Sequence, residues 1–187
     1  MKAVYIDQHS DLVVECKNGN RKSQYQLYKL YSKAMFNIAM RILNKEDEAA
    51  DVLQEAFIDV FARINDFRQE TTFGLWMKQI VINRSISQLR KRRVELVDLD
   101  DSDVEELVDE EPVDYEEQEL QVQQVHKAMQ ALPDGYRVII SLYLLEGYDH
   151  EEIAHILKIS VNTSRTQFMR AKRKLVEILK NNGFSYN

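Results

Sequence analysis

Charge divides this chain, because residues 94–119 contain fourteen Asp or Glu residues and no Lys or Arg. The rest of the 187-residue chain carries 25 basic and 17 acidic residues, and both flanks of the segment are basic. A run of like charges repels itself and stays extended, and this run is poor in aromatic residues. The sequence therefore predicts two small domains, residues 1–93 and 120–187, joined by an acidic flexible linker.

Glycine and proline are scarce, with five and two residues in the chain. Strand-rich folds need both at their turns, so the composition favours helices with short connections. A single cysteine, Cys16, excludes an internal disulfide and fits a reducing compartment. The N-terminal residues do not resemble a signal peptide, and no apolar run is long enough to span a membrane. We therefore expect an all-α, cytoplasmic protein with no membrane insertion.

Apolar residues recur three and four positions apart in three stretches of the first domain. This spacing predicts amphipathic helices over residues 24–43, 46–62 and 73–92, with the apolar stripes forming the core. The second helix bears an acidic ridge, which consists of Glu48, Asp51, Glu55 and Asp59. Like charges at this spacing cost about 0.3 kcal/mol per pair in an isolated helix. The ridge therefore indicates a basic protein partner, and a solvated face without a partner is the alternative.

The third predicted helix is basic and ends in the run Arg90–Arg93, with Phe67, Phe73 and Trp76 nearby in the sequence. Lys and Arg side chains bind phosphates, and aromatic rings stack on unpaired bases. This combination favours contact with nucleic acid. The alternative is a tryptophan in the core and a solvated basic helix end, which the helix dipole favours.

The second domain is predicted to contain helices over residues 120–132 and 136–145, separated by Pro133–Gly135. A capping box then begins a short helix at Asp149, and Lys158–Ser160 form a tight turn before the last helix. Two helices joined in this way, the second polar and basic at its start, predict a helix-turn-helix that enters the major groove of DNA. Its candidate DNA-reading residues are Asn162, Thr163, Arg165, Thr166, Arg170 and Arg173.

The sequence carries no recognisable catalytic or metal-binding motif. His150 and His155 bracket a segment like a zinc motif, but their spacing of five residues puts them on different helical faces. The five glycines are scattered and form no phosphate-binding loop. We expect no enzyme activity, no cofactor and no metal site.

Three motifs, in this order, resemble the extracytoplasmic-function (ECF) group of bacterial RNA polymerase sigma factors in the sigma-70 family. Asp51–Phe57 looks like the Asp-x-x-Gln-Glu signature on the helix that binds the polymerase clamp. Asn65–Arg93 is similar to the loop and helix that melt and read the minus-ten promoter element. Ala131–Leu175 looks like the domain that reads the minus-thirty-five element. The resemblance covers residues 11–93 and 118–180, and it implies a promoter-specificity subunit without catalysis of its own.

The resemblance also implies partners and residue roles. The partners would be core RNA polymerase, through the clamp and flap of its large subunits, promoter DNA and an anti-sigma factor, with the chain acting as a monomer. Polymerase binding would fall to Asp51, Gln54, Glu55 and Asp59. Contact with minus-ten DNA would fall to Asn65, Asp66, Phe67, Arg68, Trp76, Lys78, Asn83, Arg84 and Arg90. The six residues of the last helix would read the minus-thirty-five element.

Three positions depart from the family pattern. Ser87 stands where Asp is usual, Lys158 where Gly is usual, and Ser164 where an apolar residue is usual. Lys158 deprives the turn of the residue that most easily adopts a left-handed conformation. Ser164 is expected to weaken the packing of the last helix on its support.

Two other functions stay open from the sequence. A stand-alone dimeric helix-turn-helix regulator would need palindromic half-sites and would have no use for the acidic ridge. A helical adaptor would bind an acidic protein through its basic surfaces. The linker is a spacer, or a segment that folds back on the basic domains of the free protein and suppresses non-specific DNA binding. The resemblance also implies that it threads the basic nucleic-acid channel of the polymerase, where its acids would mimic phosphates.

Overall fold

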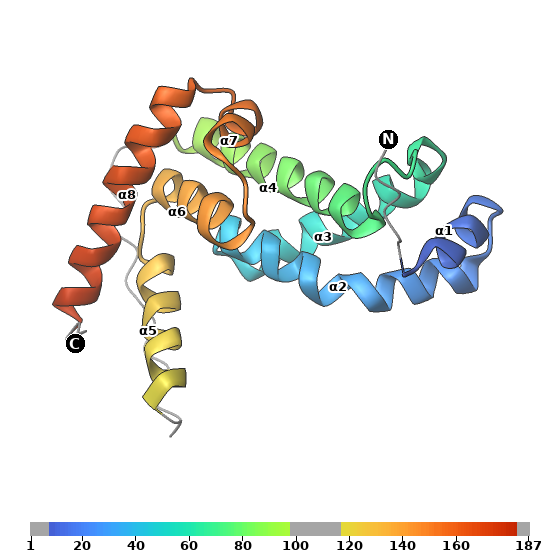
Figure 1. The fold of residues 1–187 in the computed structure, drawn as a ribbon, viewed down its shortest axis with the longest axis horizontal. Helices are drawn as coiled ribbons and strands as arrows, with labels where there is room; N and C mark the ends of the chain where they lie inside the picture. Colours follow the sequence, from blue (N-terminus) through green and yellow to red (C-terminus); the bar gives the residue numbers. More distant parts are fainter. Residues whose placement is uncertain (1–7, 98–116, 183–187) are drawn as a thin grey trace, which may run out of the picture. The chain divides into compact units, whose positions relative to one another are not determined.

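A computed structural model describes residues 8–97 and 117–182, and all regular secondary structure in these residues is helical (Figure 1). The chain forms two compact units, unit 1 (Met1–Glu95) and unit 2 (Leu96–Asn187). The predicted all-α fold with a helix-turn-helix in its second part is confirmed. Most of the predicted linker lies outside the described residues, and its two ends belong to helices. No described helix is both long enough and apolar enough to cross a membrane.

The described residues of unit 1 form four α-helices and one short 3-10 turn. The elements are α1 (Ser10–Lys17), α2 (Arg21–Leu43), α3 (Glu46–Ala62), η1 (Ile64–Asp66) and α4 (Phe73–Val97). Helix α3 has the predicted bounds, α2 begins three residues earlier than predicted, and α4 ends five residues later. The sequence analysis did not predict α1.

Local signals account for the ends of α2 and the start of α3. The side chain of Asn20 caps α2 by accepting hydrogen bonds from the backbone N–H groups of Lys22 and Ser23. Asn44 ends α2 in the left-handed conformation, with a φ of 55°, which asparagine tolerates better than most residues. Three acidic residues in the first turn of α3 favour its N-terminus through the helix dipole.

The core of unit 1 lies among α2, α3 and α4, and α1 packs on α2. Leu30 has the spacing of the apolar stripe predicted over residues 24–43, but its side chain is half exposed. Helix α1 buries Val13 and Cys16, and Cys16 is 2% exposed. Burial, with the nearby Glu15 carboxylate, raises the pKa of the Cys16 thiol to about 11. This thiol is therefore protonated at neutral pH.

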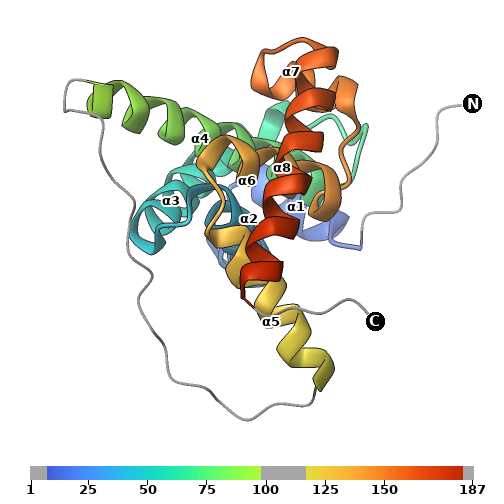
Figure 2. The same ribbon diagram turned by 90° about the vertical axis from the view of Figure 1, so that its left-hand side faces the viewer.

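Within the part of unit 2 that the structure describes, the chain forms four α-helices and one π-helical turn. The elements are α5 (Glu117–Gln130), α6 (Asp134–Ile140), η2 (Ser141–Leu145), α7 (His150–Leu157) and α8 (Val161–Asn181). Helix α8 packs on α6, and the two lie side by side in both ribbon views (Figures 1 and 2). The second half of the helix predicted over residues 136–145 is the π-helical turn.

The predicted caps of the helix-turn-helix are present. Asp149 and Glu152 form the capping box at the start of α7. Ser160 caps α8 by accepting a hydrogen bond of 3.0 Å from the backbone N–H of Thr163. Lys158 ends α7 with a φ of 56°, so the turn uses a left-handed lysine where the family pattern has glycine.

Candidate nucleic-acid and partner interfaces

Two arginines of α4 bind acids of the ridge on α3. Arg84 donates hydrogen bonds to Glu55 and Asp59, with 2.7 Å between its Nε and Asp59 Oδ2. Arg92 lies 3.3 Å from Glu48 Oε2. These pairs join α3 to α4 and offset the repulsion between like charges along α3. Three of the four acids in the ridge are therefore engaged within unit 1, which helical spacing alone does not reveal.

Asp51 and Gln54 are exposed on α3, and no side chain in the described parts of the chain pairs with either one. Ile58 lies one turn farther along and is 63% exposed. The spacing of these three residues places a carboxylate, an amide and an apolar side chain on one helical face. Such a face suits a protein partner with basic and apolar groups. The sequence analysis missed Ile58, because periodicity does not show which apolar residues stay uncovered.

The α3–α4 loop, residues 63–72, contains four of the predicted minus-ten residues. Asn65, Asp66 and Arg68 are exposed, and Asp66 accepts a hydrogen bond of 3.3 Å from Arg63. Phe67 is only 4% exposed, and its ring centroid lies 5.2 Å from that of Trp76. A ring buried in this way packs the loop and offers no face to a base. We therefore assign Phe67 to the core.

The five predicted residues of α4 differ in their position on the helix and in their exposure. Trp76, Asn83 and Arg90 follow each other at intervals of seven residues, so they lie along one side of the helix. Asn83 and Arg90 are exposed, whereas Trp76 and Lys78 are half-buried. Arg84 differs from all of these, because its guanidinium group is held by carboxylates of α3. We therefore assign Arg84 to the joint between α3 and α4.

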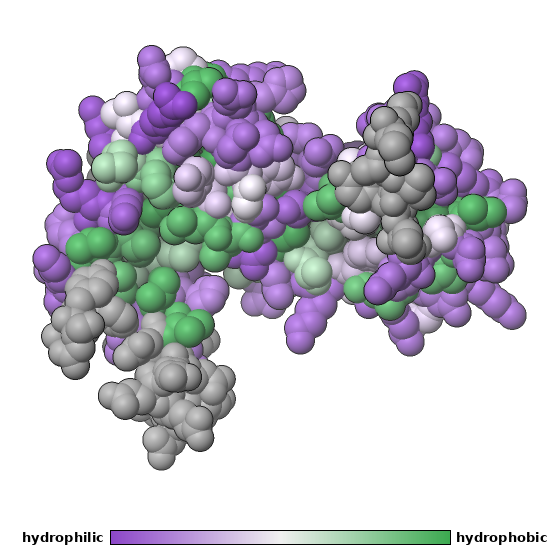
Figure 3. Space-filling view, in the orientation of Figure 1, coloured by the Kyte–Doolittle hydropathy of each residue, from purple (hydrophilic) through white to green (hydrophobic). Residues whose placement is uncertain are grey.

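Helix α8 presents most of its predicted DNA-reading residues to solvent. The exposed ones are Asn162, Arg165, Thr166, Arg170 and Arg173. Thr163 is half-buried, and its hydroxyl group lies 2.7 Å from Ser160 Oγ, so it belongs to the cap of the helix. Figure 3 shows hydrophilic residues along the outer edge of α8 and hydrophobic residues on the side toward α5 and α6.

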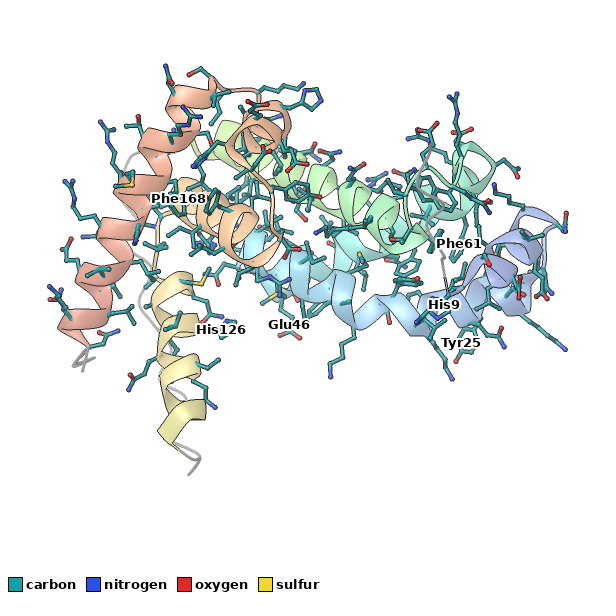
Figure 4. All side chains as sticks on the ribbon, viewed as in Figure 1. His9, Tyr25, Glu46, Phe61, His126 and Phe168 are labelled. Carbon is teal, nitrogen blue, oxygen red and sulfur yellow. The ribbon has the colours of Figure 1, made fainter. Side chains whose placement is uncertain are left out.

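A hydrogen bond between α7 and α8 replaces the apolar contact that is usual at Ser164. Ser164 is fully buried, and its Oγ lies 2.9 Å from His150 Nδ1. The His150 ring stacks on Tyr143, with 4.7 Å between centroids, and meets the edge of Phe168 at 5.6 Å. Phe168 is labelled on α8 in Figure 4. This cluster fixes α8 relative to α7, and the sequence analysis missed the role of His150 in it.

Comparisons with known proteins agree with this geometry. The family described as "Sigma-70 region 2" matches residues 27–95, and "Sigma-70, region 4" matches residues 122–175. RNA polymerase sigma-H factor of Pseudomonas aeruginosa is 28% identical over 182 residues, which cover 92% of this chain and 94% of that protein. ECF RNA polymerase sigma-E factor of Escherichia coli is 28% identical over 175 residues, which cover 88% and 90%.

A solved structure of the sigma factor RpoE in complex with the anti-sigma factor NepR, from Bartonella quintana, is similar in fold. Its TM-score is 0.60 at 29% identity, with 83% of this chain and 96% of that chain covered. The matches reach both units and include the acidic face of α3, the α3–α4 loop and the helix-turn-helix. The chain belongs to the sigma-70 family, in its ECF group, and is a sigma factor that directs RNA polymerase to promoters and initiates transcription.

Proposed function

We propose that the two units divide promoter recognition between them, with residues 1–93 binding core polymerase and the minus-ten element and residues 120–187 reading the minus-thirty-five element. The observation that carries this proposal is that some side chains of the acidic face of α3 are paired within unit 1 while others are exposed. Arg84 and Arg92 bind the acids on either side of Asp51, while Asp51 and Gln54 stay exposed. The fold of unit 1 does not need these two side chains, so they are available to the polymerase.

Minus-ten DNA would meet the exposed part of the α3–α4 loop and one side of α4. Asn65 and Arg68 supply hydrogen-bonding groups on the loop. Trp76, Asn83 and Arg90 supply an aromatic ring, an amide and a guanidinium group along the helix. An unpaired base can stack on an aromatic ring, and the guanidinium group can bind phosphate. These groups suit a strand separated from its complement.

Minus-thirty-five DNA would meet the first turns of α8 in the major groove. Arg165 lies close to the N-terminus of the helix, where side chains reach base edges and arginine reads guanine. Arg173 lies about two turns farther along and suits a phosphate contact. The capped turn at Ser160 and the His150–Ser164 hydrogen bond hold this helix in place.

This proposal extends to the partners of the chain and to its oligomeric state. RpoE is bound to an anti-sigma factor in its solved structure, and we propose that an anti-sigma factor restrains this chain as well. The two reading surfaces differ from each other, which suits a monomer on an asymmetric promoter. The chain would act without catalysis or cofactor, in the cytoplasm, where the polymerase works.

The test is transcription by core polymerase, with and without the chain, on a genomic promoter library. The decisive variant is Asp51→Lys, since Asp51 has no partner among the described residues of unit 1. A cation facing a basic partner should weaken polymerase binding by about 2 kcal/mol, or roughly 30-fold. The control is Asp11→Lys, which makes the same charge change at an exposed position on α1.

Asp51→Lys should keep the wild-type helicity, because Asp51 is exposed and lies beyond the first turn of α3. Asp11→Lys places a cation in the first turn of α1, where the helix dipole disfavours it, so the helicity of the control is measured alongside. Core polymerase that binds Asp51→Lys as tightly as the wild type would contradict the docking role of α3. Binding to palindromic DNA as a dimer, without polymerase, would instead favour a stand-alone regulator.

A further inference from the structure

We propose that helix α1 holds the α3–α4 loop in its working shape, and that Lys17 is a positioning residue for reading the minus-ten element. The inference rests on the proposed function of that loop. It concerns a helix that the sequence analysis did not predict and that carries none of the expected site residues.

Lys17 reaches the loop across 50 residues of sequence. Its Nζ donates a hydrogen bond of 2.8 Å to the backbone oxygen of Phe67 and lies 5.8 Å from the centroid of the Phe67 ring. No carboxylate in the described residues pairs with this ammonium group, so the loop carbonyl is its partner. A hydrogen bond from a charged donor is stronger than a neutral one. Lys17 therefore fixes the backbone between Asp66 and Arg68.

A second contact reaches the other end of the loop. His9 precedes α1 and lies against α2 (Figure 4), with its Nδ1 2.9 Å from the hydroxyl group of Tyr31. The Tyr31 ring packs edge-on against Phe73, the first residue of α4, at 5.3 Å. A Cβ atom on Gly74 would lie 3.0 Å from Tyr31 Cε1, so glycine is what lets this ring approach. The α1 region therefore supports both ends of the loop.

Helix α1 is itself fixed to α2. Val13 and Cys16 are buried, and the Glu15 carboxylate accepts hydrogen bonds from Ser23 and, at 3.3 Å, from Asn20. Asn20 also caps α2, so the turn between α1 and α2 is held by several bonds. Lys17 is the last residue of α1, so the backbone from which it reaches the Phe67 carbonyl is itself held in place.

The loop needs such support because its own conformation is unfavourable. Gln69 has a φ of 58°, a left-handed conformation that costs free energy for any residue with a Cβ atom. The exposed residues Asn65 and Arg68 flank Phe67, the residue that Lys17 holds. A change at Lys17 would thus shift the groups proposed to meet the minus-ten base without touching them.

The test compares Lys17→Met with Lys33→Met, a matched loss of charge at an exposed position on α2. The first readout is fluorescence of the free protein, because Trp76 is the chain's single tryptophan and packs on Phe67. The second is the base preference at each minus-ten position in a promoter library transcribed with core polymerase. Polymerase binding and thermal unfolding are measured alongside.

We expect Lys17→Met to change Trp76 emission and its quenching by acrylamide, and Lys33→Met to change neither. The preference ratio at one or two minus-ten positions should fall roughly 3- to 10-fold, the factor that one hydrogen bond contributes. Preferences at minus-thirty-five positions and polymerase binding should be unchanged. Lys17→Arg, which keeps a charged donor, should restore most of the wild-type preference.

Unchanged Trp76 fluorescence in Lys17→Met would overturn the support of the loop by α1. Changed fluorescence with an equal loss at every promoter would overturn the positioning role, because simple destabilisation does not select bases. The double variant Asn65→Ala/Arg68→Ala tests the proposed minus-ten function of the loop separately from the positioning role of Lys17. If the double variant leaves minus-ten preference unchanged, the proposed function of the loop is wrong, and the positioning role fails with it.

Discussion

Unit 1 and unit 2 hold their DNA-facing helices in different ways. In unit 1, α4 is joined to α3 through Arg84 and its two carboxylates and through Arg92 and Glu48. In unit 2, α8 is set by a buried hydrogen bond and by the capped turn within its own helix-turn-helix. The helix proposed to meet melted DNA is therefore bonded to the helix proposed to meet polymerase. The helix proposed to read duplex DNA is held by contacts within its own helix-turn-helix.

This difference has a functional consequence. We propose that Arg84 forms a mechanical link between polymerase docking on α3 and strand opening by α4, because its ion pairs join the two helices. Changes in the two units should therefore have separable effects.

The largest expected effect concerns the recognition helix. Arg165→Ala should weaken promoter binding by about 1–3 kcal/mol and relax base preference at one or two minus-thirty-five positions. Arg173→Ala should weaken all promoters alike, because a phosphate contact carries no sequence information. Both are measured by binding of the polymerase complex to a promoter library. Equal, sequence-independent losses from both variants would contradict this division, and a loss of core binding would contradict the proposal that polymerase binding falls to unit 1.

The next largest effect is expected at the joint between α3 and α4, where Arg84 binds Glu55 and Asp59. Arg84→Met leaves Glu55 and Asp59 side by side without their shared cation, and should lower the free energy of unfolding of unit 1 by about 1.5 kcal/mol. Trp76 fluorescence during urea unfolding reports on this unit. The difference from wild type should shrink in high salt, which screens partly exposed charges.

Lys91→Met is the matched control, since Lys91 is an exposed base on the same helix. Arg84→Met should also slow open-complex formation on promoters. An unchanged rate, together with the expected loss of stability, would break the mechanical link and leave Arg84 as a purely structural residue.

A smaller effect is expected at the buried hydrogen bond of unit 2. Ser164→Ala should destabilise the packing of α7 on α8 by about 1 kcal/mol, because His150 Nδ1 loses its partner. Hydrogen exchange of amides in α7 and α8 measures this change locally. In the background of His150→Phe, the same Ser164→Ala change should cost much less, since the bond is already absent. Equal costs in both backgrounds would show that the contact contributes nothing.

The smallest effect concerns the turn of the helix-turn-helix. Lys158→Gly should stabilise unit 2 by about 0.5 kcal/mol, because glycine adopts a φ near 56° without a steric cost. The gain is partly offset by the greater freedom of glycine in the unfolded chain. Thermal unfolding shows whether Lys158→Gly raises or lowers the stability of unit 2. The control is Lys172→Gly, which should lower the stability because it places a glycine inside helix α8.

Local sequence signals predicted most of the fold. Helix α3 and the caps at Asp149 and Ser160 depend on neighbours a few residues away, and they appear where predicted. Helix α1 was missed because it has eight residues and buries only two of them. Its stability depends on α2, which a local pattern does not show.

The exposure of the candidate site residues was predicted better in unit 2 than in unit 1. On α8, exposure follows helical spacing, so most of the named residues lie at the surface. In unit 1, Phe67 and Arg84 have the residue types of a nucleic-acid surface but are engaged by Trp76 and by the acids of α3. These partners lie on other elements, so the sequence pattern could not distinguish surface residues from core or paired ones.

The burial of Cys16 bears on how such a regulator responds to its surroundings. A thiol reacts with peroxide or alkylating agents as the thiolate, and Cys16 is both enclosed by α1 and α2 and protonated at neutral pH. It is the only cysteine in the chain. The folded protein therefore shields its one thiol from oxidants, and local opening of α1 would have to precede any oxidation of Cys16.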